Sequence, residues 1–152
     1  AIAVALGINI PQCSVDAVEI SSKAFFYLKE NCKQAINVSP INDDIFKFRP
    51  NNNYDIITAN PPYITFDEMK VLQKEVTYEP SLALQAEDNG LYFYKNITKM
   101  YKQYINDGGY LVFEIGYKQK NDVETILKDN EFKDIKCIKD LCGNDRVIIG
   151  RK

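Results

Sequence analysis

The chain has 152 residues, of which 45% are hydrophobic and 26% charged, so it can bury the core of one domain and is not disordered by composition. Its net charge of −2 argues against a large surface for the phosphate backbone of nucleic acids. It contains no histidine, which excludes the commonest general base and the commonest metal ligand.

The four cysteines are scattered, and no two of them form a Cys-x-x-Cys pair. We therefore expect neither zinc nor a redox dithiol, but reduced thiols in a cytoplasmic protein. No apolar run approaches the roughly 18 residues that a membrane span needs. The apolar start, residues 1–6, lacks a basic leader and is too short for a signal peptide.

The first elements predicted are a helix, a strand and a second helix. Residues 1–6 are small and apolar and indicate a buried helix that Gly7 and Pro11 end. Residues 14–20 favour a strand whose last charged residue is Glu19, and a serine at position 21 or 22 can cap the next helix. The inward face of that helix is predicted from helical spacing: Phe25, Leu28, Cys32 and Ala35.

The middle of the chain predicts two strands and a long loop. Residues 38–44 form a poor strand that Pro40 breaks, and residues 54–59 form an apolar strand. Residues 64–89 are interpreted as a functional loop with a short helix around 68–74, which Asn89-Gly90 ends.

The last third predicts a long helix, an apolar strand, a helix and two closing strands. The long helix carries Ile97, Met100, Tyr101 and Tyr104 on one side, and the segment 107–109 stops it. The remaining elements are expected at 110–115, 121–128, 132–138 and 146–150. This alternation implies an open, mostly parallel α/β sheet, and the closing strands, with no helix between them, should pair antiparallel at one edge.

The tetrapeptide Asn60-Pro61-Pro62-Tyr63, here called the 60–63 corner, lies where the strand 54–59 ends. Each proline restricts the residue before it, so the turn is stiff and fixes Asn60 relative to Tyr63. The Asn60 side-chain oxygen and the Pro61 carbonyl can each accept one proton of a planar N–H₂ group, and Tyr63 can pack on its face. The corner fits methyl transfer to an amide or exocyclic amino nitrogen. The alternative is a rigid turn without chemistry.

Acidic residues end the two strands before this corner. In nucleotide-binding sheets, an acid at a strand end bonds the ribose hydroxyls, about 20 residues beyond a glycine-rich turn. Glu19 suits that role, although the glycine turn and its strand are not found in the sequence. After the next strand, Asp43 or Asp44 could accept a bond from an adenine amino group, and Ile45 could pack on the purine. The alternatives are a solvated carboxylate at Glu19 and an ordinary loop at 43–45.

Several short blocks of the sequence form a recognisable series. The blocks are Asn60-Pro61-Pro62-Tyr63-Ile64, Glu75-Val76, Glu79-Pro80, Ala83-Leu84, Asn89-Gly90-Leu91, Glu114-Ile115-Gly116, Gln119, Lys139-Asp140-Leu141, Gly143 and Asp145-Arg146-Val147. Together they resemble the release-factor glutamine methyltransferase family (HemK/PrmC), and the resemblance runs from the first residue to the last. The corner alone is shared with amino-methylating DNA enzymes, whereas the later blocks are more specific.

The resemblance implies a Rossmann-like, class I S-adenosylmethionine-dependent methyltransferase. It implies methylation of the glutamine amide in the Gly-Gly-Gln motif of peptide chain release factors, in translation termination. Carried over to this sequence, Glu19 would bind the ribose, and Ile45 would lie beside the adenine with Asp44 next to it. Asn60, Pro61, Pro62 and Tyr63 would hold the glutamine, with Asn60, Pro61 and Tyr63 as the catalytic set. Asn60 would also border the methyl donor.

The family's glycine-rich loop, first strand and N-terminal helical domain have no counterpart in the sequence, and residues 1–6 match the helix after that loop. Residues 1–152 therefore resemble a truncated catalytic domain with its first strand missing. We expect a monomer that acts on a protein, needs no metal and contacts no membrane. Glu114 is interpreted as structural, Arg146 as tying the last hairpin to Asp140 or Asp145, and Glu79-Pro80 as shaping the substrate loop.

Two alternatives stay open. A DNA or RNA amino-methyltransferase could use the same corner, but it would need a target-recognition segment and a basic groove, and neither is visible. The chain could also be an inactive fragment. Losing the inward side chains of a central strand, at about 1.5–3 kcal/mol each, rivals a total stability of about 5–15 kcal/mol.

Overall fold

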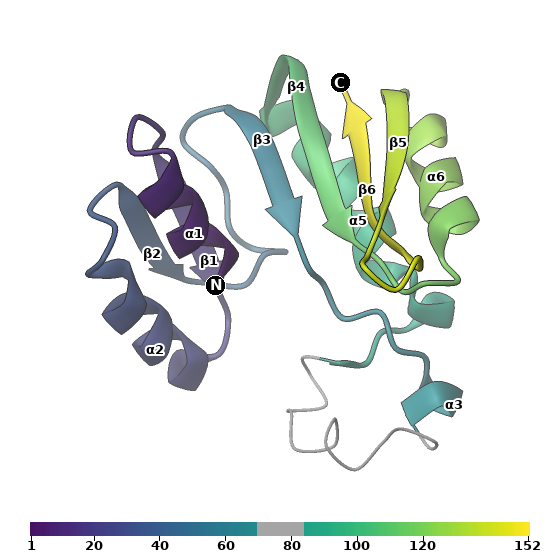
Figure 1. Cartoon of the computed structure of the whole chain (residues 1–152), viewed down its shortest axis with the longest axis horizontal. Coiled ribbons are helices and arrows are strands. Elements are labelled where there is room, and N and C mark those ends of the chain that lie inside the picture. Colours follow the sequence, from purple (N-terminus) through teal and green to yellow (C-terminus); the bar gives the residue numbers. More distant parts are fainter. Residues whose placement is uncertain (70–83) are drawn as a thin grey trace. The chain divides into compact units, whose positions relative to one another are not determined.

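The computed structural model describes residues 1–69 and 84–152 (Figure 1). The chain divides into two compact units, Ala1–Arg49 and Pro50–Lys152, and each is described by itself. The end of the helix predicted over 68–74 and the segment Glu79-Pro80 lie outside the described residues. The expectation of one domain over 1–152 stays a prediction.

The first unit pairs two parallel strands through a connecting helix. Its elements are α1 (Ile2–Asn9), β1 (Val15–Glu19), α2 (Ser22–Cys32) and β2 (Val38–Asn42). Parallel strands need such a crossover connection, and α2 supplies it. In the register, Val15 lies opposite Val38 and Glu19 opposite Asn42, so both strands end at the same edge. Buried side chains from both strands, from α2 and from the turn between α2 and β2 form the core, namely Ala17, Cys32, Ala35 and Val38.

Two features of this unit differ from the sequence prediction. The helix α1 continues through Gly7, because a β-carbon there would lie 2.5 Å from Cγ2 of Val38, and its absence lets the helix approach β2. Strand β2 is continuous through Pro40, which lies opposite Ala17. Among the described strands β2 pairs with β1 alone, and such an edge strand accepts a residue without an N–H. The predicted cap is confirmed, since Ser21 Oγ accepts a hydrogen bond from the Ala24 N–H at 3.3 Å.

The second unit is a four-stranded sheet covered by two helices. The sheet order is β3-β4-β6-β5. Strands β3 and β4 run parallel, and β6 is antiparallel to both of its neighbours, so the predicted closing hairpin at one edge is confirmed. Figure 1 shows α5 and α6 against this sheet. The elements are β3 (Tyr54–Ala59), α3 (Phe66–Met69), η2 (Asp88–Gly90), α5 (Tyr92–Tyr101), η3 (Lys102–Tyr104), β4 (Ile105–Glu114), α6 (Lys120–Asp129), β5 (Lys133–Lys139) and β6 (Asp145–Arg151).

The core of this unit fixes β4 against α5. The Tyr94 and Phe113 rings are fully buried and meet edge to face, with centroids 5.2 Å apart. Ile97 and Tyr101 point inward from α5, as their spacing predicts. Each such side chain contributes about 1.5–3 kcal/mol by leaving water. The carboxyl end of β4 is therefore held firmly in place.

The start of β4 corrects the sequence prediction. The sequence predicts that the segment 107–109 stops the preceding helix, but α5 ends at Tyr101 and β4 already begins at Ile105. Gly108 has a φ of +81°, and the pairing with β3 shifts register between Tyr54 and Ile56. Gly108 and Gly109 therefore form an irregularity within the strand, where the Gly108 N–H donates to the Lys152 carbonyl at 3.2 Å.

No helix in the described part of the chain is long and apolar enough to cross a membrane.

Candidate functional site

The 60–63 corner follows β3 at the carboxyl end of a parallel strand, as predicted. Asn60 is exposed, Pro61 is buried, and Tyr63 is half-buried. Just beyond the corner, the Ile64 N–H donates to the Leu84 carbonyl at 2.9 Å, and the Ile64 carbonyl accepts from the Ala86 N–H at 3.0 Å. The corner is thus fixed by β3 before it and by this bridge after it, while Asn60 stays open to solvent.

A glutamine side chain joins the corner to the turn after β4. Gln119 Nε2 donates to the Tyr63 carbonyl oxygen at 3.2 Å, across a sequence separation of 56 residues. Its Oε1 accepts from the Gly116 N–H at 3.0 Å. The sequence marks Gln119 only as part of a family block and gives it no role. Because the contact is long-range and uses a backbone carbonyl, no local pattern indicates it.

The turn Asp88–Gly90 packs its backbone against the same carbonyl. A β-carbon at Gly90 would lie 2.2 Å from the Tyr63 oxygen and 2.5 Å from Gln119 Nε2. Asp88, Asn89 and Gly90 all have left-handed backbones, with φ values of 56°, 53° and 81°. Non-glycine residues in such regions cost on the order of 1–3 kcal/mol each, and strain of this kind gathers at functional sites. The sequence marks Asn89-Gly90 only as the end of a loop.

Tyr94 supports the end of β4. Its hydroxyl donates to the Glu114 carbonyl at 3.0 Å and lies 3.5 Å from Gln119 Oε1. Burial, with smaller contributions from Tyr63 and Glu114, raises the pKa of the Tyr94 phenol far above its ordinary value. Tyr94 therefore stays protonated and donates at any physiological pH. The Glu114 backbone has a structural role here, and the interpretation of its side chain stays a prediction.

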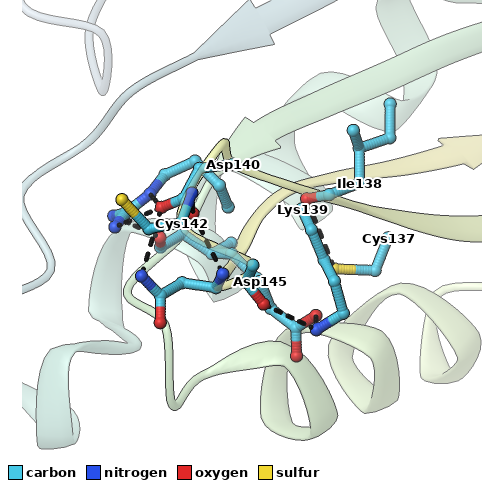
Figure 2. Close-up of polar contacts among 10 residues, drawn as sticks. Cys137, Ile138, Lys139, Asp140, Cys142 and Asp145 are labelled. Carbon is cyan, nitrogen blue, oxygen red and sulfur yellow. Dashed lines mark hydrogen bonds and ion pairs between the residues drawn. The ribbon is translucent and has the colours of Figure 1, made fainter.

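The closing hairpin also holds the end of β4, through Arg146. Its Nη1 donates to the Ile115 carbonyl at 3.2 Å, one residue before Gly116. Its Nη2 lies 3.3 Å from Asp140 Oδ2, so of the two acids that the sequence offers, Asp140 is the partner. Asp145 instead pairs with Lys139 at 2.8 Å. In Figure 2 the contacts of Asp140 and those of the Lys139–Asp145 pair form two separate sets in the hairpin.

The Asp140 carboxylate organises the tip of that hairpin. Its Oδ1 accepts hydrogen bonds from the Cys142 and Asn144 N–H groups, each at 2.9 Å. These backbone bonds, led by that from Asn144, hold the pKa of Asp140 below its ordinary value. Asp140 therefore stays ionised as the counterion of Arg146.

Three of the four residues expected to bind the cofactor lie in the first unit, at the carboxyl ends of its parallel strands, whereas the fourth, Asn60, lies in the second unit. Glu19 ends β1, and its Oε1 accepts from the Ser21 N–H at 2.8 Å. Asp44 follows β2, and its Oδ1 accepts from the Phe46 N–H at 2.9 Å. Both carboxylates are partly exposed, and Ile45 is half-buried beside Asp44. Glu19, Asp44 and Ile45 thus share one edge, and their combination with the 60–63 corner in one site stays a prediction.

No family model matches the sequence. Two curated relatives align along nearly the whole chain. The release factor glutamine methyltransferase of Fusobacterium nucleatum is 44% identical over 156 residues, covering 100% of this chain and 44% of the relative. That of Clostridium botulinum is 37% identical over 157 residues, covering 99% of this chain and 56% of the relative. The chain spans about half the length of the curated relatives that it matches.

The fold has counterparts among solved structures. The crystal structure of a methyltransferase from Pyrococcus furiosus matches with a TM-score of 0.70 at 20% identity, covering 97% of this chain and 67% of that one. At that identity the likeness shows the fold alone, which is the expected α/β fold of class I S-adenosylmethionine-dependent methyltransferases. With the alignments to the two curated relatives, it follows that the chain belongs to the release factor glutamine methyltransferase family.

Proposed function

We propose that this protein transfers a methyl group from S-adenosylmethionine to the glutamine amide nitrogen in the Gly-Gly-Gln motif of peptide chain release factors. The observation that carries the proposal is the 60–63 corner, which presents an exposed Asn60 at the end of β3. The names of the relatives supply the substrate class. The corner supplies the groups that can hold a carboxamide.

The corner addresses the main chemical difficulty of the reaction. An amide nitrogen is a poor nucleophile because its lone pair is delocalised into the carbonyl. Asn60 Oδ1 and the Pro61 carbonyl can accept both N–H protons and so direct the lone pair away from them. Pro61 is buried, and its role needs only its carbonyl oxygen. As the N–CH₃ bond forms, the methyl–sulfonium bond breaks to leave a thioether, and the nitrogen then gives up one of its two protons to solvent, which reaches the exposed Asn60. No strong base is required, which agrees with a sequence that contains no histidine.

Rigid orientation supplies the rest of the acceleration. Two prolines stiffen the corner, and the Ile64 hydrogen bonds to Leu84 and Ala86 fix its far end. Holding two reactants in line can contribute about 7–11 kcal/mol of the barrier. Tyr63, which is half-buried, can limit the rotation of the amide by packing on its face.

The acidic edge of the first unit suits the proposed cofactor. When bound, S-adenosylmethionine supplies a methyl group activated by a sulfonium. Glu19 is oriented by the Ser21 N–H and keeps acceptor capacity for ribose hydroxyls. Asp44 is ordered by the Phe46 N–H at its Oδ1. Its Oδ2 lies 3.9 Å from Lys47 Nζ and keeps a lone pair to accept from the adenine amino group. Ile45 offers an apolar surface beside Asp44 for the purine.

We further propose that the protein works as a monomer in the cytoplasm, with the release factor as its macromolecular partner. The thiols of Cys13, Cys32, Cys137 and Cys142 are all free, which suits a reducing compartment. Light scattering at working concentration tests the monomer, and a mass of two chains would overturn it.

The test is a competition for one labelled methyl donor. The protein at its natural, gene-encoded length receives S-adenosylmethionine labelled on the methyl group, a release factor and double-stranded DNA in one reaction. A release factor with asparagine in place of the motif glutamine is the matched control. We expect label on the glutamine of the first release factor alone. Label in DNA would instead support an amino-methyltransferase of nucleic acid, and label in neither substrate would overturn the proposal.

A further inference from the structure

We propose that Gln119 is a positioning residue for the methyl transfer, acting through the Tyr63 carbonyl. This inference rests on the proposed function. Gln119 lies outside the 60–63 corner and would not touch the substrate. Its carboxamide fixes the peptide group at which the corner ends, and with it the direction of the Tyr63 ring.

The peptide group between Tyr63 and Ile64 is held on both of its polar edges. Its carbonyl accepts from Gln119 Nε2 at 3.2 Å, and its N–H donates to the Leu84 carbonyl at 2.9 Å. A planar group with both edges bonded has little freedom to rotate. The backbone torsion of Tyr63 that precedes this group is therefore set by Gln119 on one side and by Leu84 on the other.

Only one orientation of the Gln119 amide satisfies its surroundings. Its Oε1 accepts from the Gly116 N–H at 3.0 Å while its Nε2 faces the Tyr63 carbonyl. If the amide were flipped, Nε2 would face the Gly116 N–H and Oε1 would face the Tyr63 carbonyl, so neither hydrogen bond could form. A carboxamide carries a donor and an acceptor on one neutral planar group, which is what this position demands.

Helix capping does not account for Gln119. It occupies the N-cap position of α6, where Ser, Thr, Asp or Asn usually bonds the first free N–H groups. The Gln119 side chain makes no such bond to its own helix. Its polar atoms instead form hydrogen bonds with the Gly116 N–H and the Tyr63 carbonyl. The absence of a side chain at Gly90 leaves room for this, because a β-carbon there would lie 2.5 Å from Nε2.

The decisive variant is Gln119→Glu in the protein at its natural length. It keeps the side-chain shape and the acceptor for Gly116, but turns a carboxylate oxygen toward the Tyr63 carbonyl. At pH 8 we expect kcat/KM for the release factor to fall about 10- to 100-fold, chiefly through kcat, because small misplacements are costly in an oriented reaction. The affinity for S-adenosylmethionine should not change.

Lowering the pH separates positioning from general damage. The introduced carboxyl faces a carbonyl oxygen, which raises its pKa, and protonation restores a donor to Tyr63. The ratio of variant to wild-type kcat should therefore rise as the pH falls from about 8 toward about 6. Because the variant and the wild-type protein share the nearby charged groups, the ratio removes the effects that these groups have on kcat in both proteins. Those groups are Tyr63, Tyr94, Glu114 and Arg146. The matched control is Gln103→Glu, since Gln103 Nε2 also donates to a backbone carbonyl, that of Met100 at 3.1 Å, away from the corner.

Hydrogen exchange at the Ile64 amide provides a readout that needs no activity. Freeing the peptide group at its carbonyl should speed exchange there in Gln119→Glu and leave it unchanged in Gln103→Glu. The inference would be overturned if Gln119→Glu exchanged its Ile64 amide at the wild-type rate, or if its kcat equalled the wild-type kcat across the pH range. Should the wild-type protein fail to methylate the release factor, the proposed function fails, and the exchange result still decides whether Gln119 holds the corner.

Discussion

The backbone of Gly90 packs directly on the carbonyl of Tyr63, so closely that a β-carbon at position 90 would lie 2.2 Å from that oxygen. The same oxygen accepts the Gln119 hydrogen bond. The corner that we propose to hold the substrate therefore rests on a turn and a helix start that are distant in sequence. Substitutions at Gly90 or Gln119 should therefore affect methyl transfer although neither residue contacts the substrate.

Gly90→Ala is expected to destabilise the protein and to lower methyl transfer. The new methyl group costs about 1–3 kcal/mol through overpacking, in addition to about 1–2 kcal/mol for an L residue in a left-handed backbone. Gly108→Ala is the matched control, because Gly108 has the same φ of +81° but no atom within 4 Å of the place that a β-carbon would take. Urea unfolding should show the larger loss for Gly90→Ala, and equal losses would mean that the contact with Tyr63 carries no energy.

Thr98→Val should stabilise the protein. Thr98 is fully buried in α5, and its hydroxyl oxygen has no hydrogen-bond partner among the described residues. Removing an unsatisfied buried hydroxyl at constant shape should gain about 1 kcal/mol. Thr98→Ser keeps the hydroxyl and loses the methyl group, so it should destabilise. Thermal unfolding of both variants checks this, and a destabilised Thr98→Val would show that the hydroxyl is bonded after all.

Asp140 should give the protein a specific loss of stability in acid. Its folded-state pKa is held below the ordinary value of 3.8, chiefly by the Asn144 N–H. The folded protein therefore binds this proton less readily than the unfolded chain. The stabilisation is present above pH 3.8 and is lost as the pH falls through the folded-state pKa. Asp140→Asn should flatten the acid limb of the stability curve, whereas Asp129→Asn, on an exposed site of α6, should leave the wild-type shape.

Sequence periodicity predicts most of the secondary structure correctly, and the exceptions have tertiary causes. The strand 54–59 and the inward residues Ile97 and Tyr101 follow from local patterns alone. Gly7 is read as a helix end because glycine disfavours helices, yet close packing on Val38 keeps it inside α1. Pro40 is read as a strand break, yet an edge position tolerates it.

The candidate site also combines features that local sequence predicts with features that depend on tertiary contacts. The 60–63 corner is visible in the sequence because its prolines and its place after an apolar strand are local. Its supports are not visible, since Gln119 acts across 56 residues on a backbone atom that any residue type would carry. Gly90 is likewise read as a loop end, although its lack of a side chain serves a contact with Tyr63.

The most direct test of the account is to separate turnover from cofactor binding in Asn60→Ala. The variant loses one acceptor for the substrate amide, so we predict that kcat for the release factor falls by about 100-fold or more, while the S-adenosylmethionine affinity from calorimetry falls much less. Asn53→Ala, at an exposed position before β3, should leave both quantities unchanged. Equal losses of turnover and cofactor affinity in Asn60→Ala, or a wild-type kcat, would contradict the claim that this corner grips the glutamine carboxamide.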